Sequence, residues 1–123
     1  MPMDRSSKPR VLVVEDDDFV TRMLKDALAS LEIDAVYVKT AEAALESARQ
    51  RLPALVLADY VLPGRDGMNL LAEIGGLRGQ PKRVLVTGRE RISALWGQDI
   101  PVLFKPFSVA TVRRLVSELL ASA

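Results

Sequence analysis

The chain contains neither cysteine nor histidine, and these two absences exclude much of the chemistry that proteins perform. Without a thiolate or an imidazole it cannot build a Cys/His zinc site, a disulfide framework, a cysteine nucleophile or a Ser-His-Asp triad. Any functional site must therefore consist of carboxylates, amines and hydroxyls. The lack of cysteine is compatible with a reducing cytosol, although secreted proteins can also lack it.

Long apolar segments are absent as well. No stretch approaches the ~18 consecutive apolar residues of a membrane helix, and the polar residues 1–10 have no apolar run behind them, so they do not form a signal peptide. We therefore expect a soluble, cytoplasmic protein. Its 123 residues, 49% of them hydrophobic, suffice for one domain around a single core. We place this domain at residues 10–123, behind a flexible tail at residues 1–9.

No strong excess of charge of either sign is present. The net charge is +1, with 8 basic and 11 acidic residues in positions 1–61 and 9 basic and 5 acidic residues in positions 62–123. This asymmetry is too small to indicate nucleic-acid binding, for which a dense basic patch is expected. We expect neither nucleic acid nor a membrane as a partner.

What the chain does contain is a series of short apolar runs. The runs at 11–14, 54–58, 84–86 and 102–104 are continuously apolar, which is typical of strands covered on both faces in a parallel sheet. A shorter run at 35–38 predicts a fifth strand, nearer an edge.

Segments with helical periodicity lie between these runs. One apolar stripe extends from Val20 to Leu31 behind the acidic residues 16–18, for which we expect helix capping and dipole interactions at Asp17 and Asp18. Further helices are predicted over 41–48 behind Thr40, over 70–74 behind Asp66 and before Gly75 and Gly76, over 90–96, and behind Ser108. The inward-facing residues of the last helix are expected to be Val109, Val112, Leu115, Val116, Leu119 and Leu120.

Strict alternation of strand and helix predicts an α/β fold of the (βα)5 type. Such an order forms a doubly wound parallel sheet with right-handed crossovers and helices on both faces. For five strands the usual arrangement is the flavodoxin-like order 2-1-3-4-5.

Polar residues follow the buried strands at their carboxyl ends. Glu15 and Asp16 follow the first strand, Asp59 the third, Thr87 the fourth and Lys105 the fifth. In doubly wound sheets ligands bind outside these ends, at the switch point between strands 1 and 3, so three carboxylates converge there.

At ~4 Å and an effective dielectric constant near 20, each like-charge pair costs on the order of 4 kcal/mol. An all-oxygen site of this kind suits Mg²⁺, and a carboxylate beside Mg²⁺, a lysine and a hydroxyl is a constellation for phosphoryl transfer.

These motifs resemble the receiver domains of bacterial two-component response regulators. The matching pieces are Val11 to Asp17, Asp59 to Gly67, Val84 to Gly88, and Lys105-Pro106-Phe107, so that the resemblance covers about residues 9 to 121. It implies a phosphorelay protein that is a phosphoacceptor rather than a classical enzyme.

The resemblance implies a role for each site residue. Asp59 would be the phosphoacceptor, Asp16 would bind Mg²⁺ directly and Glu15 through water, and the backbone carbonyl of Val61 would complete the ligands. Lys105 would contact one phosphoryl oxygen and Thr87 another, and Gly88 would leave room for the group. A cis peptide bond is expected at Lys105-Pro106, whereas Asp66-Gly67 is interpreted as the start of the third helix, outside the site.

The sequence departs from the family at one position. Many receivers carry Tyr or Phe three residues before the lysine, where this chain has Val102. Phe104 lies on the same side of the strand by the two-residue period and is a candidate replacement.

Alternative hypotheses remain open at this stage. The chain could be a receiver-like interaction module that acts without phosphorylation, or a receiver excised from a hybrid histidine kinase. A haloacid dehalogenase-type phosphatase is disfavoured, because Val61 occupies the place of the second Asp which that family needs.

The missing histidine also bears on the partners. In the family the phosphoryl group arrives from a phosphohistidine, so we expect a histidine kinase or a His-containing phosphotransfer protein as the donor. We expect no output domain after the last helix, and we therefore expect output through contact with a downstream protein or onward transfer of the group.

Overall fold

A computed structural model of the chain describes residues 8–88 and 100–122. The predicted helix over 90–96 and most of the predicted tail lie outside these residues. The elements in chain order are β1 (Arg10–Val14), α1 (Asp18–Leu28), β2 (Asp34–Val38), α2 (Ala41–Gln50), β3 (Leu55–Asp59), β4 (Val61–Leu62), β5 (Arg65–Asp66), α3 (Gly67–Gly75), β6 (Lys82–Thr87), β7 (Val102–Phe104) and α4 (Val109–Ala121).

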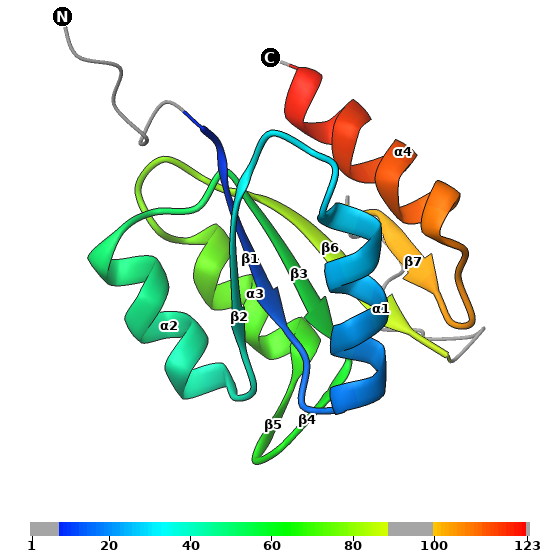
Figure 1. Ribbon diagram of the computed structural model, residues 1–123. Helices are drawn as coiled ribbons and strands as arrows, with labels where there is room; N and C mark the ends of the chain where they lie inside the picture. The colour runs from blue at the N-terminus through cyan, green and yellow to red at the C-terminus, as the bar shows by residue number, and fades with distance from the viewer. Residues whose placement is uncertain (1–7, 89–99, 123) are drawn as a thin grey trace, which may run out of the picture.

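Five strands form one parallel sheet in the order β2-β1-β3-β6-β7. This is the doubly wound order predicted from the sequence, with β3 in the centre (Figure 1). Since all strands run in one direction, their carboxyl ends share one edge of the sheet. Val14 pairs with both Val38 and Ala58, and Asp59 pairs with Val86.

The sheet separates two apolar layers. Val11 and Val13 of β1 point toward α1 and α4, whereas Leu12 and Val14 point toward α2 and α3. Because successive side chains of a strand alternate between faces, a strand covered on both sides must be apolar throughout. Full burial of one such side chain contributes roughly 1.5–3 kcal/mol to folding.

Each of the four described helices begins at the polar residue that the sequence indicates. The capping side chains accept hydrogen bonds from backbone N–H groups of the first turn, which otherwise have no partner within the helix. These residues are Asp17, Thr40, Asp66 and Ser108. Asp17 Oδ1, for example, accepts from the N–H groups of Phe19 and Val20 at 2.8 and 3.0 Å.

Three details of the sequence prediction are wrong. Leu31 lies beyond the end of α1 at Leu28, although it still packs against the core. The apolar pattern therefore continues past the end of the helix. Val109 is 38% exposed and does not face inward. It is the first residue of α4, and the buried residues of this helix begin one turn later, at Val112. Ala54 is exposed and precedes β3.

A small antiparallel hairpin follows β3 and was not predicted. Strands β4 and β5 form a separate two-stranded sheet, joined by Pro63 and Gly64. Gly64 has φ +80°, a backbone conformation that favours glycine. The hairpin extends from the end of the large sheet at which the β3 arrowhead lies (Figure 1).

Candidate functional site

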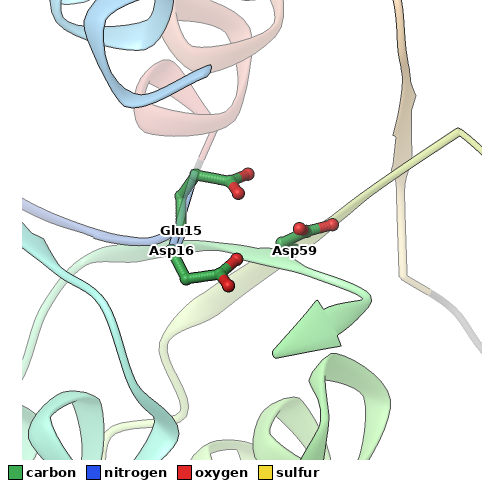
Figure 2. Close-up of side chains that lie close together, drawn as sticks. All are labelled: Glu15, Asp16 and Asp59. Carbon is green, nitrogen blue, oxygen red and sulfur yellow. The ribbon is translucent and has the colours of Figure 1, made fainter. Parts of the chain in front are cut away.

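Three carboxylates meet at the carboxyl edge of the sheet, at the predicted switch point. Glu15 and Asp16 directly follow β1, and Asp59 is the last residue of the neighbouring strand β3. One carboxylate oxygen from each residue lies within 4.8 Å of the others. Figure 2 shows the three side chains gathered at this edge, two from the segment after β1 and one from the end of β3.

The three carboxylates differ in their exposure to solvent. Glu15 is 2% exposed and Asp59 is 7% exposed, whereas Asp16 is exposed. Glu15 Oε2 accepts a hydrogen bond from the backbone N–H of Asp17 at 3.1 Å. Glu15 Oε1 is buried and accepts no hydrogen bond from the described residues. The Lys105 ammonium, 3.4 Å from this oxygen, offsets part of the cost of burying it, and a second cation in the pocket would offset more.

Burial raises the pKa of Glu15 from 4.5 to about 7. The negative charge of Asp59 acts in the same direction, while the Asp17 N–H and the Lys105 ammonium lower the pKa and only partly compensate. The pocket therefore holds one carboxylate that titrates near neutral pH instead of near pH 4.5.

Lys105 brings a positive charge to the two buried carboxylates. Its Nζ lies 3.4 Å from Glu15 Oε1 and 3.3 Å from Asp59 Oδ2. Burial lowers the pKa of Lys105, but the charges of Glu15 and Asp59 outweigh this effect and the net pKa is raised. The residue follows β7, its N–H donates to the carbonyl of Thr87 at 2.8 Å, and the peptide bond to Pro106 is cis, as predicted.

Thr87 and Gly88 lie at the end of β6, on the other side of Asp59 from β1. Thr87 is the last residue of β6 and is 2% exposed, one strand away from Asp59. Gly88 is exposed, and a Cβ placed there would lie 3.9 Å from the Lys105 Cβ, an ordinary contact. Phe104 pairs in register with Thr87 and is 46% exposed. The side chain of Val61, two residues after Asp59, is 58% exposed.

Gly67 supports the site in a way that the sequence interpretation missed. It begins α3, as predicted, but its N–H also donates to the carbonyl of Tyr60 at 2.7 Å, and a Cβ at this position would overlap the carbonyl oxygen of Asp59. A glycine at the first position of a helix, where it is unfavourable, was the available signal.

The donor set of this site fits a hard divalent cation. Glu15, Asp16 and Asp59 supply oxygen atoms only, and Lys105 alone leaves the group with an excess of negative charge. Mg²⁺ prefers such oxygens and is usually held by few carboxylates while it retains several waters. The residues present therefore fit a magnesium ion.

An apolar groove lies beside the site. It has a volume of about 260 Å³ and is lined by Phe19, Val20 and Met23 of α1 and by Lys105, Pro106 and Phe107. Phe19 is 72% exposed, which is unusual for a large aromatic side chain. Lys105 thus borders both the groove and the acidic pocket. In residues 8–88 and 100–122 we find no helix with the length and hydropathy to cross a bilayer.

The chain is similar to known signalling proteins. Residues 11–117 match the response regulator receiver domain. The chain is 31% identical to the transcriptional regulatory protein BaeR of Escherichia coli O6:H1, over 98% of this chain and 51% of that protein. It is 33% identical to protein-glutamate methylesterase/protein-glutamine glutaminase 5 of Myxococcus xanthus, over 85% of this chain and 32% of that protein. The chain thus spans about half and about a third of these relatives' lengths.

A solved structure supports the same assignment. The signal receiver domain of an HD domain-containing protein from Pseudomonas fluorescens Pf-5 superposes with a TM-score of 0.85 at 25% identity, covering 98% of this chain and 90% of that one. Receiver domains generally accept a phosphoryl group from histidine kinases, and an acidic cluster of this kind is typical of their metal site. With its sheet order, its acidic edge and this match over nearly its whole length, the chain belongs to the family of response regulator receiver domains.

Proposed function

We propose that Asp59 accepts a phosphoryl group from the phosphohistidine of a partner kinase or phosphotransfer protein, and that the product changes contacts with a downstream protein. The observation that carries this proposal is the position of Lys105, whose Nζ lies 3.3 Å from Asp59 Oδ2 within the acidic pocket. A nucleophilic carboxylate, a fixed cation and metal-binding oxygens are the parts that phosphoryl transfer requires.

The transfer begins with attack by a carboxylate oxygen of Asp59 on phosphorus. The new O–P bond forms as the N–P bond of the donor breaks, and the electron pair of that bond returns to the imidazole nitrogen. Mg²⁺ would be held by Asp16, Asp59 and the backbone carbonyl of Val61, with Glu15 acting through water, and would neutralise charge on the transferring group. Asp59 is held for attack by its place at the end of the central strand.

Lys105 and Thr87 act on the phosphoryl oxygens. The Lys105 ammonium, now paired with two carboxylates, neutralises charge on one oxygen as the group arrives. The Thr87 hydroxyl donates to another oxygen, and Gly88 leaves space for the group beside Lys105.

The apolar groove beside Lys105 is where the donor protein docks in this proposal. Phe19 is 72% exposed and lines the groove that Lys105 also borders, and exposed aromatic side chains that gather with other apolar residues mark protein contacts. A phosphohistidine on an apolar helical surface seated there would face Asp59 across Lys105.

Intact-mass measurement tests the proposal. With Mg²⁺ and a small-molecule phosphodonor such as acetyl phosphate, the protein should gain one phosphoryl group. Asp59→Asn should abolish the gain, because an amide is not a nucleophile for this step. Asp66→Asn is the matched control. Asp66 is exposed and caps α3, and Asn is also a good cap, so this variant should gain the phosphoryl group as the wild type does. If the wild-type protein gains no mass under these conditions, the proposal is refuted.

A further inference from the structure

The β4–β5 hairpin carries the main chain that follows Asp59. Besides Asp66, which caps α3, two side chains attach it to the rest of the molecule. Leu62 and Arg65 are paired in its antiparallel register, so both side chains point to the same side of the hairpin. Leu62 is 7% exposed and belongs to the core layer of α2 and α3. Val61, the next residue along β4, points to the opposite side and is 58% exposed.

Arg65 fixes the second strand of the hairpin to α3. Its Nη2 donates to Asn69 Oδ1 and, at 3.0 Å, to Glu73 Oε1, one helical turn further along. The side chain of Arg65 is only 23% exposed, so this ion pair is less screened by solvent than an ordinary surface pair. Glu73 also accepts from Arg49 of α2 at 3.2 Å through its other oxygen.

We propose that Arg65 is a positioning residue for the metal site: by holding the hairpin against α3, it fixes the Val61 main chain where Mg²⁺ is bound. This inference rests on the proposed function, which assigns the Val61 carbonyl to the metal. Without Arg65 the hairpin keeps its apolar anchor Leu62 and can pivot about it, which displaces Val61 on the opposite side. Groups that orient metal ligands typically contribute about 10- to 100-fold in metal affinity.

Arginine suits this role better than lysine. The guanidinium carries several donors in a fixed plane and can contact two acceptors at once, whereas an ammonium is a single point charge. Asn69 and Glu73 stand four residues apart on α3, on the face that lies beside β5.

Two matched variants separate positioning of the metal site from simple loss of an ion pair. Arg65→Met and Arg49→Met each remove one arginine partner of Glu73 and retain a long, unbranched side chain, but only Arg65 belongs to the hairpin. Mg²⁺ affinity is measured by isothermal titration calorimetry on the unphosphorylated proteins, and stability by urea denaturation in EDTA. We expect Arg65→Met to weaken Mg²⁺ binding about tenfold, while Arg49→Met binds like the wild type. Arg65→Met should also lose more stability, because the Arg65 side chain is 23% exposed and the Arg49 side chain 58%.

Equal Mg²⁺ affinity in the wild type and Arg65→Met overturns the inference, as does an equal loss in the two variants. A wild type that binds no Mg²⁺ instead overturns the proposed function. If Arg65→Met does not fold, Asn69→Ala removes one of the two acceptors of Arg65 and leaves a good helix former. A wild-type Mg²⁺ affinity in Asn69→Ala then overturns the inference.

Discussion

Glu15 is the residue at which folding and the proposed chemistry oppose each other. Its carboxylate is buried beside that of Asp59, and burial raises its pKa to about 7. A buried carboxylate that is costly to ionise lowers the stability of the empty protein and favours any cation that enters the pocket. In this chain the destabilising carboxylate lies at the position where a bound metal ion would stabilise it.

This position predicts how stability depends on pH. The folded-state pKa of about 7 lies above the unfolded value of 4.5, so the folded state holds the proton more tightly. The contribution of Glu15 is therefore fully present below pH 4.5 and is lost as the pH rises through about 7, an effect of at most a few kcal/mol. In EDTA, the free energy of unfolding should fall over this range, and Glu15→Gln should remove most of the fall.

Urea denaturation near pH 4.5 and above pH 7 measures this difference. Glu46→Gln is the control, because Glu46 is exposed on α2 and is not one of the three clustered carboxylates. Identical pH profiles for the wild type and Glu15→Gln would contradict the prediction.

Single residues show what could be predicted from the sequence. Glu15, Asp16, Asp59 and Lys105 were identifiable because strand ends of a parallel sheet share an edge, so position along the chain gives position in space. Arg65 was not, because its contacts with Asn69 and Glu73 depend on a hairpin without a periodic pattern. The raised pKa of Glu15 likewise depends on burial, which the sequence does not give residue by residue.

At the scale of elements, the junction between β3 and α3 is closely packed. The first residue of α3 lies against the backbone of Asp59, and only glycine leaves room for it. The hairpin itself was missed in the sequence because each of its strands has two residues, too few for any alternation to show. The long strands were predicted because their runs are apolar on both faces.

Gly67→Ala should therefore destabilise the protein. Alanine favours a helix by about 1 kcal/mol over glycine, but its Cβ would overlap the Asp59 carbonyl, and forced overpacking costs typically about 1–3 kcal/mol or more. We expect a net loss of about 1–2 kcal/mol by urea denaturation and slower labelling by a small-molecule phosphodonor, because the Asp59 backbone must move.

Gly76→Ala is the control for this variant. Gly76 follows α3 with φ −83°, and a Cβ there would lie 3.4 Å from its nearest neighbour, an ordinary contact. Equal stability and equal labelling of the two variants would show that the close approach of Gly67 to Asp59 has no consequence.

At the scale of the whole molecule, the two ends of the sheet differ in charge. The carboxyl edge carries Glu15, Asp16 and Asp59, whereas a surface groove at the opposite end is lined by Lys8, Arg10 and Arg51. The charge balance of the two sequence halves did not indicate this difference, because all six residues lie in positions 1–61 and are separated only by the alignment of the strands. In the proposed function, a phosphohistidine donor approaches this acidic edge, and the apolar groove lined by Phe19 offers it a contact there.

Phe19→Ser tests this docking arrangement. Phe19 is 72% exposed, so its loss should change stability by less than about 0.5 kcal/mol. Labelling by acetyl phosphate should stay unchanged, while transfer from a purified histidine phosphotransfer protein that labels the wild type should slow about tenfold, as expected for an aromatic anchor.

Leu52→Ser is the control for Phe19→Ser. Leu52 is 39% exposed and lines the basic groove at the other end of the sheet. A Phe19→Ser protein that receives the phosphoryl group from the donor protein at the wild-type rate would refute the docking surface.

The central position of β3 gives the two sides of the site different dynamics. All five residues of β3 are buried, and its neighbours β1 and β6 pair with it on both sides, so its amide hydrogens exchange with solvent only when the whole domain opens. The hairpin, a two-stranded sheet with two residues in each strand, can open locally at much lower free energy. Asp59 therefore keeps its place on the slowest timescale of the molecule, while the backbone of Val61 beside it adjusts on a faster one, to the extent that the contacts of Arg65 with α3 allow.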